Sequence, residues 1–183
     1  MRRLLVNQMG LNRYASLHVK QQGVTLVELM VTIAIMAILL MVAVPGFQQI
    51  MLNSRLRSYA NDFAASATLA RSEALKRNHV VKLCASANGT SCAAVEWESG
   101  WIVIDDVLDP DVVIAAHPSL AAGYALTETG GDKSIEFKAS GAGSDSAVLT
   151  LCRASPVGNE ERVITLAPTG RSTIAKTTAG ICS

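Results

Sequence analysis

The 183-residue chain has few of the side chains that enzymes use for chemistry. Only three histidines occur, and His18 lies in a basic N-terminal stretch, which leaves His79 and His117. The sequence has no HExxH, GxSxG, Walker A or GxGxxG motif, so the common arrangements for metal, nucleophile and phosphate chemistry are missing. We therefore predict a protein that is not an enzyme and that has no cofactor and no metal site.

The chain also lacks a large excess of charge of one sign, because its formal net charge is only +1. The part beyond Pro45 has twelve basic and fourteen acidic residues. Its net charge gives no general attraction to nucleic acid or anionic lipid, so any such binding would have to be local. One acidic stretch lacks the regular spacing of a calcium loop, and we interpret it as a solvated loop: Asp105, Asp106, Asp109 and Asp111.

Aromatic residues make up only 4% of the chain although half of it is apolar, so the apolar residues are mostly aliphatic. Many of them form one run from Val24 to Val44, VTLVELMVTIAIMAILLMVAV. About 20 apolar residues suffice to cross a hydrocarbon core about 30 Å thick as a helix. The residues before the run are basic and predict a single-pass protein with a cytoplasmic N-terminus and an exported remainder: Arg2, Arg3, Arg13 and Lys20.

Glu28 places a carboxylate inside this apolar run. Such a group costs about 2.5 to 3.5 kcal/mol on membrane-insertion scales, less near a helix end, so it should have a partner or a role. A peptidase that cut between Gly23 and Val24 would remove a basic leader, residues 1–23, and leave an ammonium group on Val24. That group on a neighbouring subunit is a suitable partner for Glu28. Alternatively, Glu28 lies at headgroup level and needs no partner.

Pro45 follows the apolar run, and we expect it either to kink the helix of residues 24–45 or to end it, because proline removes a backbone hydrogen bond. Apolar residues then recur at steps of three and four and predict an amphipathic helix over residues 46–78, ending near Asn78: Leu52, Leu56, Tyr59, Phe63, Ala67, Ala70 and Ala74. This stripe should pack on a sheet.

Residues 79–183 read as a β-rich head. Trp97 and Trp101 are expected to be core residues, with a partner-binding surface as the alternative. A strand is predicted from Trp101 to Ile104, and further candidates are rich in β-branched residues: Val80–Cys84, Val112–Ala115, Ile135–Phe137, Ala147–Cys152 and Arg162–Leu166. A long helix followed by short antiparallel strands predicts an α+β fold with the helix packed on an antiparallel sheet.

All four cysteines lie in this exported part, and none forms a CxxC pair, which favours two disulfides over a zinc or redox site. Cys84 and Cys92 bracket an Asn88-Gly89 turn signal and are expected to face each other across the loop. That pairing leaves Cys152 with Cys182, although sequence alone leaves the connectivity open. A closed loop of about 30 residues would stabilise the head by roughly 3 to 4 kcal/mol on the chain-entropy model.

The N-terminal motif resembles that of the type IV pilin and pseudopilin superfamily, which has glycine, a hydrophobic first mature residue and glutamate at the fifth mature position. Gly23, Val24 and Glu28 occupy these places, with valine where the family usually has phenylalanine. The resemblance implies that prepilin peptidase cleaves after Gly23 and methylates Val24. It also implies that Glu28 brings new subunits into register, and that the assembly helix bends or melts at Pro45.

Two further segments, ARSEALKRNHVVKLC from Ala70 and GWIVIDD from Gly100, resemble the GspH/FimT branch, which contains minor pilins such as FimU and H-type minor pseudopilins. This resemblance implies a structural subunit, held in the bacterial inner membrane with a periplasmic head, that helps to initiate or tip a type IV pilus or a type II secretion pseudopilus. The implied partners are other major and minor pilins or pseudopilins, prepilin peptidase and the inner-membrane assembly platform.

An alternative function is DNA binding in a competence pilus. Family members that act in DNA uptake carry a GRxR motif near the C-terminus, and Gly170 and Arg171 match its first half, with Lys176 close by. Thr173 stands in place of the second arginine, which removes one phosphate contact. A glycine turn flanked by exposed cations is the structural alternative.

Overall fold

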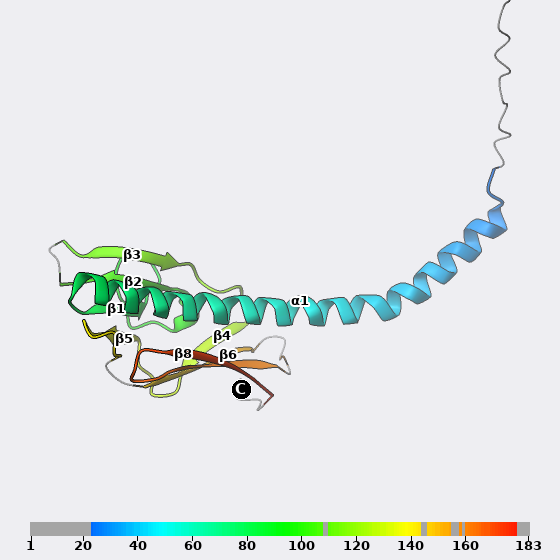
Figure 1. Ribbon diagram of the computed structural model, residues 1–183. Coiled ribbons are helices and arrows are strands. Elements are labelled where there is room, and N and C mark those ends of the chain that lie inside the picture. Colours follow the sequence, from blue (N-terminus) through cyan, green and yellow to red (C-terminus); the bar gives the residue numbers. More distant parts are fainter. Residues whose placement is uncertain (1–22, 108–109, 144–145, 155–157, 159, 179–183) are drawn as a thin grey trace, which may run out of the picture. The chain divides into compact units, whose positions relative to one another are not determined.

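The computed structural model describes residues 23–107, 110–143, 146–154, 158 and 160–178, with the side chain of Pro45 left out (Figure 1). Within these residues the chain forms a helix α1, Leu26–Arg77, a short 3-10 helix η1, Trp97–Ser99, and eight strands. The strands are β1 Val81–Ala85, β2 Trp101–Asp105, β3 Val112–His117, β4 Tyr124–Glu128, β5 Ser134–Phe137, β6 Ala147–Arg153, β7 Glu161–Leu166 and β8 Ser172–Thr177. The chain divides into two compact units, the first ending at Val44 and the second beginning at Pro45.

The first unit contains the apolar part of α1. Its described side chains, from Gly23 to Val44, are all exposed, and α1 is long and apolar enough to cross a membrane. Burial of apolar surface is the main stabilising contribution to folding. Within the described residues, the large apolar side chains of this segment are all about half or more exposed, so they are suited to contact with lipid or with another protein.

The second unit combines the C-terminal part of α1 with two antiparallel sheets. One sheet has the strand order β3-β2-β1-β5, and the other has the order β4-β6-β7-β8. The α+β class and the packing of the helix on antiparallel strands are therefore confirmed. The sequence leads us to expect one sheet, whereas the structure has two four-stranded sheets. Figure 1 shows the green end of α1 running along both of them.

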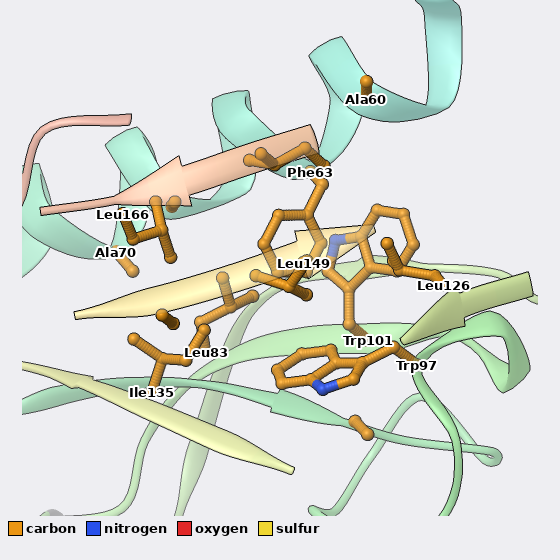
Figure 2. Close-up of a cluster of buried hydrophobic side chains, with 14 of the residues drawn as sticks. Ala60, Phe63, Ala70, Leu83, Trp97, Trp101, Leu126, Ile135, Leu149 and Leu166 are labelled. Atoms are coloured by element: carbon orange, nitrogen blue, oxygen red, sulfur yellow. The ribbon is translucent and has the colours of Figure 1, made fainter. Parts of the chain in front are cut away.

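The face of α1 that packs on the sheets is narrow and made mostly of small residues. Leu56, Phe63 and the alanines of this face are almost fully buried, and their spacing of three and four residues keeps them on one side of the helix: Ala60, Ala67, Ala70 and Ala74. Opposite them lie apolar side chains from both sheets, among them Leu83, Ile135, Leu149 and Leu166 (Figure 2). The predicted apolar stripe is thus the core side of α1.

Phe63 is the centre of an aromatic group at this interface. Its ring centroid lies 5.3 Å from those of Trp97 and Trp101, in edge-to-face geometry. Each indole also donates a hydrogen bond, Trp97 Nε1 to the Asp132 carbonyl at 2.8 Å and Trp101 Nε1 to Ser66 Oγ at 2.9 Å. Both tryptophans are at most 1% exposed, so their prediction as core residues is confirmed.

The helix ends where the sequence predicts. Arg77 is its last residue, and Asn78 follows with a φ of 59°. A left-handed residue after the last turn is a common helix stop, and asparagine tolerates that conformation better than most side chains. The chain then turns into β1.

Two strands have no counterpart in the sequence analysis. β4 is Tyr-Ala-Leu-Thr-Glu, and β8 is Ser-Thr-Ile-Ala-Lys-Thr, whose residues are partly or largely exposed. β8 pairs with β7 alone in its sheet, so it is an edge strand. Because β8 is an edge strand with little burial, its sequence shows no clear alternation of apolar and polar residues from which a strand could be predicted.

Candidate functional site

The proposed cleavage site lies just before α1. Gly23 and Val24 are exposed and have no helical structure, and Val24 has 68% of its surface accessible. A Cβ added at Gly23 would meet no other atom within 4 Å. A peptidase therefore has an exposed, non-helical backbone to bind at this point.

Thr25 and Glu28 form the start of the helix. Thr25 Oγ1 accepts a hydrogen bond of 3.2 Å from the Glu28 backbone N–H, as an N-cap residue does. Glu28 lies in the first turn, where the helix dipole favours a negative charge. The sequence analysis missed this role, although Thr-x-x-Glu before an apolar run is a readable capping pattern. The Glu28 side chain is exposed and so open to a partner.

Pro45 does not end the helix, because α1 is continuous from Leu26 to Arg77. The alternative in which the helix stops at Pro45 therefore does not hold. Pro45 instead marks the division between the two compact units. A proline within a helix leaves one carbonyl of the preceding turn without its usual partner, which makes this position weaker than its neighbours.

The cysteines at the start of the head are joined. Cys84 and Cys92 form a disulfide with a Cα–Cα distance of 5.5 Å. The loop between them turns at Gly89, whose φ is 71°, and Asn88 Oδ1 accepts hydrogen bonds from the backbone N–H groups of Thr90 and Ser91. Cys152 on β6 is also disulfide-bonded. Cys182, its expected partner, lies outside the described residues.

Arg171 and Lys176 do not form one basic site. They lie at opposite ends of β8, about five residues apart, which corresponds to roughly 17 Å along a strand. Lys176 Nζ is 2.7 Å from Glu160 Oε1, and this hydrogen bond lowers the pKa of the Glu160 carboxyl. Lys176 is therefore part of an ion pair at one end of the hairpin, while Arg171 follows the turn at the other.

Gly170 has a structural role in that turn. Its φ is 75°, and its N–H donates a hydrogen bond of 2.8 Å to the Ala167 carbonyl. A Cβ at this position would lie 2.2 Å from the Gly141 carbonyl oxygen and 3.1 Å from Arg71 Cδ. The glycine is thus required by backbone conformation and by close packing on α1, which accounts for it without a ligand.

Asp105 is the position at which the sequence interpretation was wrong. It is the last residue of β2 and has no exposed surface, so it does not belong to a solvated acidic loop. Its Oδ2 lies 3.0 Å from Arg77 Nη1 and 3.3 Å from His79 Nε2. Buried carboxylates need such partners, and the network attaches the end of α1 to β2. Asp109, by contrast, lies outside the described residues.

Comparison with known proteins gives two matches to protein families. Residues 59–170 match the family described as type II transport protein GspH, and residues 19–44 match the prokaryotic N-terminal methylation motif. No curated protein matches the sequence significantly. The first family match covers the C-terminal part of α1 from Tyr59 and the strands β1 to β7, and the second covers the proposed cleavage site and the apolar run.

Two solved structures share this fold. The type IV minor pilin FimU of Pseudomonas aeruginosa strain PAO1 is 19% identical, with a TM-score of 0.51 over 67% of this chain and 90% of that one. The minor pseudopilin EpsH from the type 2 secretion system of Vibrio cholerae is 13% identical, with a TM-score of 0.50 over 69% of this chain and 98% of that one. At these identities the likeness concerns the fold alone.

Proposed function

The chain belongs to the GspH family and is a minor pilin or pseudopilin subunit, and we propose that it helps to initiate or tip a type IV pilus or a type II secretion pseudopilus. The family match spans more than half of the chain, and the family implies a membrane-anchored protein that assembles with other pilins in a filament. Nothing in the described part of the chain favours a DNA-binding role: Arg171 and Lys176 are separated along β8, and Lys176 is paired with Glu160.

The observation that carries this proposal is the exposure of the apolar part of α1. Its large apolar side chains are about half to four-fifths exposed, from Val24 to Val44. Such a surface is stable in lipid before assembly and between other apolar helices afterwards. A subunit that moves from membrane to filament needs this property, whereas a periplasmic protein released from its signal does not.

The processing steps are part of the same proposal. Prepilin peptidase would cut after Gly23, where the backbone is exposed and non-helical, and would methylate Val24. The basic leader would keep the N-terminus in the cytoplasm and the head in the periplasm. Glu28 would then meet the amino group of Val24 on a neighbouring subunit, while the assembly platform supplies the site of insertion.

Filament counts test the proposed function. In a strain that lacks the gene, the number of filaments per cell should fall severalfold, and expression of the chain in trans should restore it. Antibody against the head should detect the chain in sheared filaments in much smaller amount than the major pilin. Unchanged filament number, together with absence of the chain from sheared filaments, would exclude the proposal.

A further inference from the structure

A hollow in the second unit contains two arginines. It has a volume of about 350 Å³ and is lined by α1 and by Arg162 of β7; the lining residues of α1 are Ile50, Asn53, Ser54 and Arg57. Arg57 is exposed, whereas the side chain of Arg162 is only 8% exposed. One guanidinium is therefore fixed by its surroundings, and the other can adjust to a ligand.

The charge around this hollow is positive. Arg162 Nη2 lies 3.4 Å from Glu160 Oε2, and its Nη1 donates a hydrogen bond of 2.9 Å to the Glu161 carbonyl. Lys176 shares the carboxylate of Glu160. Among the described residues, Arg57 and Arg162 line the hollow, and the one carboxylate that pairs with Arg162, that of Glu160, is also paired with Lys176. Because a guanidinium has five N–H donors, Arg162 keeps donors for a further anion.

Asn53 adds a second requirement. Its Oδ1 is buried and has no hydrogen-bond partner among the described residues. Buried acceptors in folded proteins are nearly always paired, so an unpaired acceptor in a hollow of this size favours a ligand that carries a hydrogen-bond donor. The ligand should therefore carry both an anionic group for the arginines and a hydrogen-bond donor for Asn53.

The side chains around the hollow resemble those at a membrane surface. Ile50 lines the hollow and is 66% exposed, and Phe47 and Met51 on the same part of α1 are also exposed. In the sequence they follow the apolar run, and Arg57 follows them. An order of apolar run, aromatic residue and arginine is typical of the lipid interface, where long cationic side chains reach headgroups and keep their stems on apolar surface.

We propose that this hollow binds the headgroup of an anionic phospholipid of the phosphatidylglycerol type. Arg57 and Arg162 donate to the phosphodiester, a glycerol hydroxyl donates to Asn53 Oδ1, and an acyl chain lies on Ile50. Phosphatidylcholine has the phosphate but no hydroxyl donor and carries a compensating cation. This inference depends on membrane anchorage of the chain and not on its role in a filament.

Titration with short-chain lipids tests the assignment. The full chain in an uncharged detergent is titrated with dihexanoyl phosphatidylglycerol, phosphatidylmethanol and phosphatidylcholine at fixed salt concentration. Phosphatidylglycerol should bind best, because phosphatidylmethanol has the phosphodiester without the hydroxyls. Asn53→Leu should reduce binding of phosphatidylglycerol to the level of phosphatidylmethanol.

Arginine variants separate this site from general charge attraction. Arg57→Gln and Arg162→Gln should each weaken phosphatidylglycerol binding about tenfold, the effect of losing a charge-assisted hydrogen bond. Arg171→Gln removes the same charge at the other end of β8 and should leave binding unchanged. If circular dichroism shows that Arg162→Gln does not fold, Arg57→Gln alone tests the site, because Arg57 is exposed and its replacement should not affect folding.

Three results would overturn the assignment. The first is equal affinity for phosphatidylcholine and phosphatidylglycerol, and the second is binding by Arg57→Gln within about twofold of the unaltered chain. The third is tighter binding, at the same salt concentration, of a short DNA duplex or a glutamate-rich peptide that Arg57→Gln abolishes. That result would assign the hollow to nucleic acid or to an acidic protein partner.

Discussion

Arg77 Nη1 lies 3.0 Å from Oδ2 of Asp105, and thus the last turn of α1 is bonded to a carboxylate that has no contact with solvent. Arg77 Nε also bonds Glu73 Oε2 at 2.8 Å. The Arg77 guanidinium lowers the pKa of the Glu73 carboxyl, and the same bond raises the pKa of Arg77. The end of α1 is therefore held by a bridge from a helix carboxylate through Arg77 to the end of β2.

Asp105→Ala should lower the free energy of unfolding by about 2 kcal/mol, because Arg77 and the backbone N–H of Val107 lose the buried carboxylate that accepts their hydrogen bonds. Urea denaturation of the full chain in detergent, followed by tryptophan fluorescence, measures this change. Asp106→Ala is the matched control, since Asp106 pairs with Lys82 at the surface and should cost at most about 1 kcal/mol. An equal loss of stability in both variants would show that the ion pair of Arg77 with the buried Asp105 stabilises the head no more than a surface ion pair does.

Gly170→Ala should destabilise the head by about 3 kcal/mol or more, because strained φ and a backbone clash act together. Gly131→Ala isolates the first effect, since Gly131 has a φ of 82° and no atom within 4 Å of an added Cβ. That variant should cost only about 1 kcal/mol, the penalty of the left-handed conformation. Thermal unfolding measures the loss of stability in both variants. Similar losses for Gly170→Ala and Gly131→Ala would rule out the packing role of Gly170.

The ion pair of Lys176 and Glu160 should make part of the stability depend on pH. The hydrogen bond from Lys176 holds the pKa of Glu160 below its ordinary value of about 4.5 in the folded chain. The stabilisation is therefore complete above that value and is lost as the pH falls through the lower, folded pKa. Lys176→Gln should be less stable than the unaltered chain at pH 7, and the difference should shrink in acid. A difference that is constant from pH 7 to acid would contradict this.

Glu28→Ala should abolish incorporation into filaments, because no carboxylate would remain to meet the neighbouring amino group. Thr25→Ala is the control for the capping role, since it removes the hydroxyl that accepts from the Glu28 N–H and keeps the carboxylate. Immunoblots of sheared filaments report incorporation. Loss in both variants would mean that Glu28 acts through the helix start and not through a partner.

Gly23→Leu should block processing, because a bulky side chain would replace the small residue before the cut. Mass spectrometry of the unaltered chain from membranes should show a chain that begins at Val24 and carries one methyl group. The variant should retain residue 1 and should be absent from filaments. A filament-competent chain with its leader intact would refute the processing model.

Several elements of the fold could be predicted because their cause is local or periodic. The helix from the apolar run to Asn78 follows from composition and from the spacing of three and four, and the strand at Trp101 follows from β-branched residues. The disulfide between Cys84 and Cys92 agrees with the turn signal between them. In each case the signal lies within one short segment.

The remainder depends on contacts between distant segments. From the sequence, Asp105 is interpreted as part of an acidic loop. Its partner Arg77 lies 28 positions away in the sequence, and only the fold brings the two side chains together. Gly170 is likewise interpreted from the sequence as half of a basic motif. The structure shows that the backbone of Gly141 packs against it, which no local pattern indicates. The hollow between α1 and Arg162 has no sequence signature, since its residues lie more than one hundred positions apart.

The alanines on the buried face of α1 limit how the head can change. Ala60, Ala67, Ala70 and Ala74 are at most 1% exposed, so at these four positions the helix contributes only a methyl group to its interface with the sheets. Even one larger side chain in this row would force the helix away from both sheets, and overpacking of this kind costs about 1 to 3 kcal/mol. Variation that creates new partner specificity is therefore expected in loops and strand edges, while the thickness of the head stays constant.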